Sequence, residues 1–434
     1  MLPKILLAIG GVAFAAQASA LQPVDEFLRA ARTGSADNAE ARAARRQVRA
    51  EADAALGRAL PSLSLRGEYT RNELESTLTF PDPAGGPATA VTLTPRDQLD
   101  GIARLDVPLV DLASFARVGA ARTSARASAK QEAATELRVQ SLVSQDYYQL
   151  VANLALVASS RRALDVAEEG LRIAKQRHQT GTGTLLDVDR ATAEVERNVQ
   201  QVAGAELQAS LVARALQSRT GISPVLAGGA VLAADLREEP PLERFQPPDE
   251  ELPGLAAAME TRVAAEKEAR AQRLSLVPSL GASLTERVTD FEGLAGQEAT
   301  WQAVVGLSWS FDLTTLAGIR AQSAAAEGAR AREQRARLAA RDDIHRAWMT
   351  VQTNIARSRS ARVQAEVSAR AADLARDRYE VGEGTQLDLL QAQRDAFGAD
   401  AGRIQADADL LNSRAQLRVA AGESLLEPPR RGAP

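Results

Sequence analysis

The chain contains no cysteine and only two histidines among its 434 residues. The absence of cysteine excludes disulfides, zinc–thiolate sites, cysteine nucleophiles and a lipid anchor on an N-terminal cysteine. His178 and His345 lie far apart in the chain and lack the spacing of paired metal ligands. The sequence therefore predicts no metal site.

Aromatic residues are also scarce, at 3%, although hydrophobic residues reach 45% of the chain. Alanine supplies much of this apolar content. Alanine is the best helix former, and its small side chain lets helices approach closely. The composition therefore favours long, closely packed helices over a compact core filled with large side chains.

Neither sign of charge dominates, because the net charge is −4 and no block of like charge occurs. This distribution does not predict a basic surface that would bind nucleic acid. The carboxylates are dispersed along predicted helix faces, and the Gly-x-Gly elements do not follow a strand of a βαβ unit. We predict no catalytic residue, no cofactor and no nucleic-acid partner.

The N-terminus has the pattern of a targeting segment. Lys4 supplies positive charge, residues 5–16 form an apolar run, and Ala18-Ser19-Ala20 fits the small-residue cleavage rule. The run is short for a bilayer span, and no later run is apolar enough for a transmembrane helix. We predict a signal peptide at residues 1–20, with a buried N-terminal helix as the alternative.

The remaining chain is a duplication with one constant offset. Gly181 matches Gly382, 201 residues later, whereas the earlier pair Pro61 and Pro278 is 217 residues apart. The first copy therefore carries 16 extra residues, which we assign to a loop in the Pro- and Gly-rich stretch 81–95. Other pairs at the same offset are Asp111 and Asp312, Tyr147 and Trp348, Arg177 and Arg378, Leu216 and Leu417, and Gly221 and Gly422.

The duplication predicts the domain organisation of the chain. Residues 21–221 form a first structural repeat and residues 254–422 a second. The Pro- and Gly-rich segment 222–253 predicts an irregular connector that joins the copies, and not a separate domain. Residues 423–434 form a C-terminal tail.

Each copy contains a proline-free window that predicts a very long helix. Residues 112–179 and 313–380 each span 68 positions, about 100 Å if the helix is continuous. A helix of that length implies a coiled-coil-like assembly. Each ends at a Gly-containing turn, after which Thr184 or Thr385 is an N-cap candidate with an aspartate three residues on. We predict two long helical hairpins.

Two strands precede each long helix, at residues 62–69, 99–109, 279–284 and 301–311. An apolar face with aromatic residues near its ends, opposite a small or polar face, is typical of transmembrane strands. A soluble hairpin with one buried face is the alternative. Four strands cannot close a barrel, which needs about eight, so subunits must pool them. The predicted membrane-interface aromatics are Tyr69, Trp301, Trp309 and Phe311.

The motif R-[YH]-x-x-G-x-G-T-x-[LI]-D occurs twice, at residues 177–187 and 378–388. Each copy also begins its strands with Leu-Pro-Ser-Leu or Val-Pro-Ser-Leu, at residues 60–63 and 277–280. With these motifs the chain resembles the TolC-like outer membrane efflux protein family over nearly all of its mature length.

The resemblance implies a mainly α fold with a small β part. Three subunits would each give four transmembrane β-strands to a 12-stranded barrel, and their hairpins would form a coiled-coil-like α-barrel in the periplasm. Such a homotrimer is an exit duct, not an enzyme, in the outer membrane of a Gram-negative bacterium. It serves a tripartite efflux pump or a type I secretion system and passes small molecules or proteins. Its partners would be outer-membrane lipid, a periplasmic adaptor and an inner-membrane transporter of the RND, ABC or MFS type.

The resemblance also implies a periplasmic gate at the hairpin tips. Asp388 matches the first position of the family's acidic ring, whereas the second position is Gln391 here, and the family's basic gate residue falls at Gly384. Capping of the helix N-termini is the alternative role for the tip aspartates. The implied gate residues are Arg177, His178, Asp187, Asp189, Arg378, Tyr379 and Asp388. The implied adaptor-docking tips contain Gly181, Gly183, Thr184, Gly382, Gly384 and Thr385.

Two other classes of protein stay open on the residues alone. A periplasmic adaptor also has helical hairpins, but such proteins usually have one hairpin flanked by compact β domains. A structural coiled-coil protein of the envelope would have no need of the alternating segment 301–311.

Overall fold

The computed structural model describes residues 21–81, 85–86, 88–226, 234–292 and 297–428. The predicted signal peptide at residues 1–20 lies outside the described residues. The chain divides into two compact units, and each takes segments from both copies of the duplication. The helical unit comprises Met1–Ala41, Glu132–Pro253 and Leu338–Pro434, and the sheet unit comprises Arg42–Gln131 and Gly254–Arg337.

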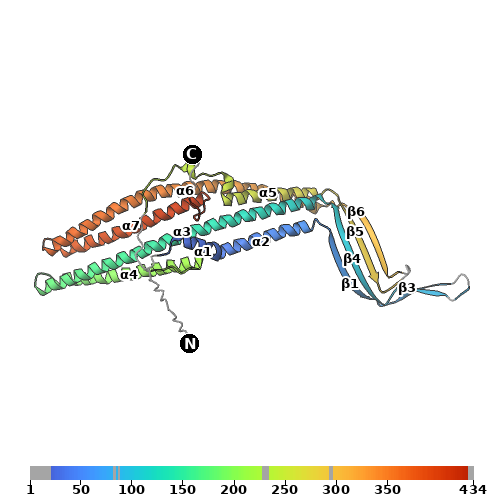
Figure 1. The fold of residues 1–434 in the computed structure, drawn as a ribbon, viewed down its shortest axis with the longest axis horizontal. Helices are drawn as coiled ribbons and strands as arrows, with labels where there is room; N and C mark the ends of the chain where they lie inside the picture. The colour runs from blue at the N-terminus through green and yellow to red at the C-terminus, as the bar shows by residue number, and fades with distance from the viewer. Residues whose placement is uncertain (1–20, 82–84, 87, 227–233, 293–296, 429–434) are drawn as a thin grey trace, which may run out of the picture. The chain divides into compact units, whose positions relative to one another are not determined.

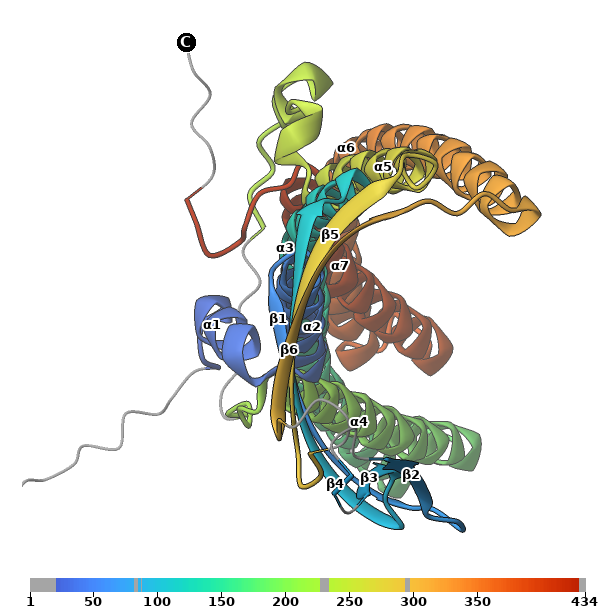
Figure 2. The same cartoon turned by 90° about the vertical axis from the view of Figure 1, so that its right-hand side faces the viewer.

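The sheet unit contains one four-stranded antiparallel sheet in the order β1-β4-β5-β6 (Figure 1). The strands are β1 (Ser62–Arg71), β4 (Asp97–Val110), β5 (Ser279–Thr289) and β6 (Ala299–Ser308). The central pair, β4 with β5, joins the two copies of the duplication. Figure 2 shows the sheet nearly edge-on, as a curved band.

The register gives the sheet two different faces. Leu63 pairs with Leu105, Leu105 with Leu284, and Leu284 with Ala303, so the apolar positions of all four strands share one face. The opposite face carries the small and polar positions, because successive side chains of a strand point to opposite sides. The predicted alternation is therefore confirmed over most of the sheet, whereas Arg71, Asp97 and Glu286 lie on the apolar face near one end of the ladders.

Three details of the predicted strands were wrong. The strand predicted at residues 279–284 continues to Thr289 as β5. Residues 81–95 are not only a loop, because β3 (Thr89–Thr94) pairs with β2 (Ser76–Phe80) in a two-stranded ribbon. The threonines and Val91 in β3 are β-branched, and such residues favour strands despite the prolines nearby. The predicted strand 301–311 ends at Ser308, and beyond it the indole nitrogen of Trp309 donates to the carbonyl of Leu276 at 3.1 Å.

The long helices have the predicted bounds. They are α3 (Leu112–Gln179) and α6 (Leu313–Glu380), each of 68 residues. Each reverses into a second helix, α4 (Leu185–Thr220) or α7 (Gln386–Ala420), so the chain forms the two expected hairpins (Figure 1). Shorter helices precede the strands of each copy; they are α1 (Val24–Gly34), α2 (Ala36–Gly57) and α5 (Pro253–Leu274).

The helical unit has small cores that hold these helices together. In one, Phe27 and Leu28 of α1 pack with Val143 and Leu150 of α3 and Leu216 of α4, all at most 2% exposed. In another, residues of α6 and α7 pack against Ala234 of the connector. The apolar side of α1 thereby closes the base of the first hairpin.

The connector is irregular in its described part apart from two short 3-10 turns, η1 (Leu242–Phe245) and η2 (Asp249–Glu251). Arg362 of α6 donates to the carbonyl of Ala234 at 2.6 Å and to the carboxylate of Asp407, a side chain only 1% exposed. The indole nitrogen of Trp348 donates to the carbonyl of Pro240 at 2.9 Å. Side chains of the second hairpin therefore hold the connector backbone.

Among the described residues, none of the helices combines the length and the apolar character that crossing a bilayer would require.

Candidate functional site at the hairpin tips

The two hairpin tips have the same backbone geometry. After α3, Gly181 adopts a φ of 76°, and the amides of Thr182 and Gly183 both donate to the carbonyl of Arg177. After α6, Gly382 adopts a φ of 88°, and the next two amides both donate to the carbonyl of Arg378. Glycine reaches this left-handed region without steric cost, which explains its place in both turns.

The second glycine of each turn is required for a different reason. A Cβ on Gly183 would lie 3.2 Å from backbone atoms of Arg177 and His178, and one on Gly384 would lie 3.2 Å from the backbone nitrogen of Tyr379. Contacts this short force the backbone to move. The close approach of the turn to the end of its own helix therefore leaves little room for a side chain at both positions, and the neighbouring backbone would have to shift by a few tenths of an ångström to admit one.

The tip aspartates form the predicted capping boxes. Thr184 accepts a hydrogen bond from the amide of Asp187, whose carboxylate accepts from the amide of Thr184. Thr385 and Asp388 repeat this arrangement at the start of α7. Hydrogen bonds from the side chain and then the amide of Thr385 hold the pKa of Asp388 below its ordinary value. Capping therefore accounts for one role of both aspartates.

Arg177 links the two hairpins at their tips. Its Nη1 donates to the carbonyl of Tyr379 at 2.7 Å, and its guanidinium lies 4.7 Å from the centre of the Tyr379 ring. Tyr379 is only 6% exposed. Burial raises the pKa of its hydroxyl, the charge of Arg177 opposes this rise, and the charge of Asp187 adds to it. A cation over an aromatic ring contributes about 0.5–1 kcal/mol at exposed sites and about 2 kcal/mol where both groups are desolvated.

Gln386 makes a second link between the tips. Its Nε2 donates to the carbonyl of Asp187 at 2.8 Å, and the side chain is only 6% exposed. Sequence reasoning missed this residue, because nothing in its immediate neighbours distinguishes it from an ordinary first-turn glutamine.

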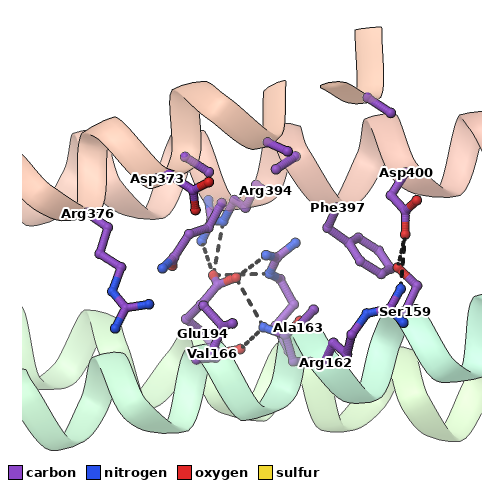
Figure 3. Close-up of a pocket in the computed structure, with 18 residues that line it drawn as sticks. Ser159, Arg162, Ala163, Val166, Glu194, Asp373, Arg376, Arg394, Phe397 and Asp400 are labelled. Carbon is purple, nitrogen blue, oxygen red and sulfur yellow. Dashed lines mark hydrogen bonds and ion pairs between the residues drawn. The ribbon is translucent and has the colours of Figure 1, made fainter. Parts of the chain in front are cut away.

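A buried carboxylate joins the hairpins further from the tips, as Figure 3 shows. Glu194 of α4, with a side chain only 4% exposed, accepts from Arg197 of the same helix and from Arg394 of α7 at 2.7 Å. Burial alone would raise the pKa of Glu194, but the two guanidinium groups outweigh it and hold the pKa below the ordinary value. Opposite charges this close favour the ionised carboxylate.

A cleft of about 500 Å³ lies beside this cluster, between the two hairpins. At its other end the hydroxyl of Ser159 donates to Asp400 of α7 at 2.6 Å (Figure 3). Phe397 reaches into the cleft from α7, and the remaining wall combines alanines with charged residues such as Arg162 and Arg376. The alanines of the wall are Ala163, Ala167, Ala365, Ala369, Ala372 and Ala396.

The structure places the implied gate residues in three ways. Arg177 and Tyr379 contact each other across the hairpins. Asp187 and Asp388 each exchange hydrogen bonds with the threonine that caps their own helix. His178 lies within 3.2 Å of the carbonyl of Gly183, and the side chains of Asp189 and Arg378 are exposed.

The four aromatics predicted for the membrane interface are all exposed, at 61% for Tyr69, 75% for Trp301, 66% for Trp309 and 65% for Phe311. Tyr69 and Trp301 lie within strands, and the other two follow the end of β6.

Comparisons with known proteins identify one family for most of the chain. A sequence model described as outer membrane efflux protein matches residues 27–221 and 250–423. No curated protein matches the sequence significantly.

Several solved structures share the fold. The outer membrane protein VceC of Vibrio cholerae is 16% identical, with a TM-score of 0.77 over 92% of this chain and 96% of its own. The outer membrane channel CmeC of Campylobacter jejuni is 16% identical, with a TM-score of 0.77 over 97% and 93%. The MtrE outer membrane channel of Neisseria gonorrhoeae, solved in an open state, is 17% identical, with a TM-score of 0.74 over 92% and 89%.

Proposed function

Because this chain belongs to the outer membrane efflux protein family, whose members are outer-membrane exit channels, we propose that it works as a homotrimeric duct gated at its hairpin tips. The duct would receive small molecules or proteins from an inner-membrane transporter and release them outside the cell. A periplasmic adaptor would join the two, in a tripartite efflux pump or a type I secretion system.

The observation that carries the proposal is the four-stranded sheet. Its apolar face is open, with Leu65 77%, Leu307 69% and Val305 68% exposed, although such side chains are normally buried. Within the part of the chain that the structure describes, its outer strands β1 and β6 each pair on one side only. An open apolar face bounded by unpaired edges calls for both a partner strand at each edge and an apolar medium.

A trimer in a bilayer meets both requirements. Three copies would pair β1 of one subunit with β6 of the next and close a barrel of twelve strands, from four in each subunit. The apolar face would contact outer-membrane lipid, with the exposed aromatics near its two interfaces. The polar face would line the duct.

The tips would form the gate and the adaptor-docking surface. In a trimer, three copies of Asp187, Asp189 and Asp388 near one axis would concentrate negative charge in a narrow mouth and favour cations. The Arg177–Tyr379 contact would restrain the hairpins of each subunit in the closed state. The glycine turns would present compact backbone to the adaptor.

Single-channel recordings test this gate with two matched variants. Thr385→Ala and Asp388→Ala both break the second capping box, but only the latter removes a charge from the mouth. We expect cation selectivity to fall in Asp388→Ala and to persist in Thr385→Ala. Equal selectivity in both variants would contradict the acidic mouth, and the absence of any channel from the unsubstituted protein would contradict the duct.

A further inference from the structure

The polar face of the four-stranded sheet carries a balanced set of charges. The register places on it three arginines and three carboxylates, within the strands that the structure describes. On the opposite face, acidic or basic residues occur toward one end of the ladders. The six charged residues of the polar face are Arg66, Glu68, Asp100, Arg104, Asp106 and Arg287.

Most of these charges are held in pairs. Arg287 of β5 donates from Nε and Nη2 to the two oxygens of Asp100 on β4, at 3.0 and 2.8 Å. Gln98 donates to the same carboxylate at 3.0 Å, and the Asp100 side chain is only 8% exposed. On β4, the Nε of Arg104 lies 2.9 Å from both oxygens of Asp106. Bidentate pairs of this kind have fixed geometry.

The polar face is also the hollowed side of the sheet. A hollow of about 680 Å³ opens on it beside the end of α2, lined by Arg104 and Asp106 together with small residues such as Gly281 and Gly306. Asp100 and Arg287 lie outside this hollow, further along the same face, and a solute passing through the hollow would come close to the Arg104–Asp106 pair.

We infer that Asp100 is a specificity-determining residue that keeps this wall near electroneutral, so that the outer part of the duct passes cargo of either charge. This inference rests on the proposed function, because it takes the polar face to line the lumen. Without Asp100, two arginines, Arg66 and Arg287, would face one carboxylate at that level, and the wall would attract anions. Repeated in three subunits, the field would extend across much of the lumen, since the Debye length is about 10 Å at 0.1 M salt.

The absence of cysteine allows a local test. A single cysteine at Gln302, on the polar face of β6, would be the only thiol of the chain. Its rates of reaction with an anionic and a cationic methanethiosulfonate, added from outside to purified trimers in vesicles, report the potential at that point. Unlike a conductance measurement, these labelling rates do not depend on how easily ions pass the hairpin tips.

We expect Asp100→Asn to raise the ratio of anionic to cationic reaction rates about twofold, and Arg287→Gln to lower it by a similar factor. Glu286→Gln is the matched control, because Glu286 neighbours Arg287 on the same strand but points to the apolar face. Asp100→Glu should restore the original ratio.

An unchanged ratio in both Asp100→Asn and Arg287→Gln, in intact trimers, would overturn the inference while leaving the duct in place. If Asp100→Asn does not assemble, Arg287→Gln alone decides, because it removes the opposite charge. Failure of the unsubstituted protein to form trimers, or labelling of Ala303→Cys in place of Gln302→Cys, would instead contradict the proposed function.

Discussion

Two glycines in each tip show how single residues fix the geometry of the hairpin turns. Gly181 needs its left-handed backbone, whereas the surroundings of Gly183 leave little room for a side chain. The sequence motif predicted a turn at both positions, but it could not separate these two requirements. They become distinct only when the neighbouring backbone atoms are known.

The left-handed backbone of Gly181 predicts that two substitutions at this position differ in their effect. Gly181→Val should destabilise the tip by about 1–2 kcal/mol, because a side chain disfavours the left-handed region, whereas Gly181→Asn should be tolerated better. We expect export to fall in the valine variant while trimers still reach the membrane, measured by drug or cargo release alongside immunoblots. Gly170→Val is the control for valine itself, since a Cβ there meets no atom within 4 Å. Normal export from Gly181→Val would count against docking at the tips.

The buried carboxylate near the cleft predicts a pH dependence. The folded-state pKa of Glu194 lies below the ordinary glutamate value of about 4.3. Its contribution to stability is therefore fully present above that pH and is lost as the pH falls through the folded-state pKa. Glu194→Gln should flatten the fall of the melting temperature in this acid range. Glu196→Gln, at an exposed position on the same helix, should follow the parent protein.

At neutral pH the same cluster predicts a loss of stability. Glu194→Ala removes charge-assisted hydrogen bonds to Arg197 and Arg394 and should cost about 1–3 kcal/mol. Chemical denaturation in detergent, followed by helical circular dichroism, measures this against Glu196→Ala. A cost equal to that of the control would mean that the cluster does not join the hairpins in solution.

At the scale of elements, the bounds of the long helices were predictable to the residue because specific residue types mark where each helix begins and ends. Asp111 and Asp312 precede them and accept hydrogen bonds from the amides of Ser114 and Thr315, and glycine turns end them. The strands were predictable through their alternation. The contacts between hairpins were not, because Glu194 and Arg394 lie 200 residues apart and no local pattern pairs them.

The ribbon β2–β3 was missed because its local sequence pattern indicated a loop. Prolines and glycines around it outweighed the short β-branched stretch in the local reading. Its pairing is set by the two strands that lead into it, β1 and β4, whose ladder brings Arg71 opposite Asp97. Long-range pairing of this kind overrides local turn signals.

The two faces of β6 predict a pair of opposite outcomes. Val305→Arg places a charge on the apolar face and should cost about 2–4 kcal/mol if the residue lies near the bilayer midplane. Val304→Arg, the next residue on the polar face, should be tolerated. Folding titrations in lipid vesicles compare the two. A greater cost at Val304 would reverse the assignment of the lipid-facing side.

At the scale of the whole molecule, the proposed duct requires more than one chain. Among the described residues, the sheet of one chain has two unpaired edges and an exposed apolar face, and the family of the chain is one of outer-membrane channels. The number of strands led to the same expectation from the sequence, because four cannot close a barrel. How the subunits meet depends on surfaces of different chains, which patterns within one chain do not encode.

Native mass measurement of the purified protein in mild detergent tests the central claim most directly. We predict a species of three times the subunit mass that resists dissociation until it is heated, because each subunit would supply strand pairs to both neighbours. A well-folded monomer, inserted in the membrane with its sheet edges unpaired, would contradict the account.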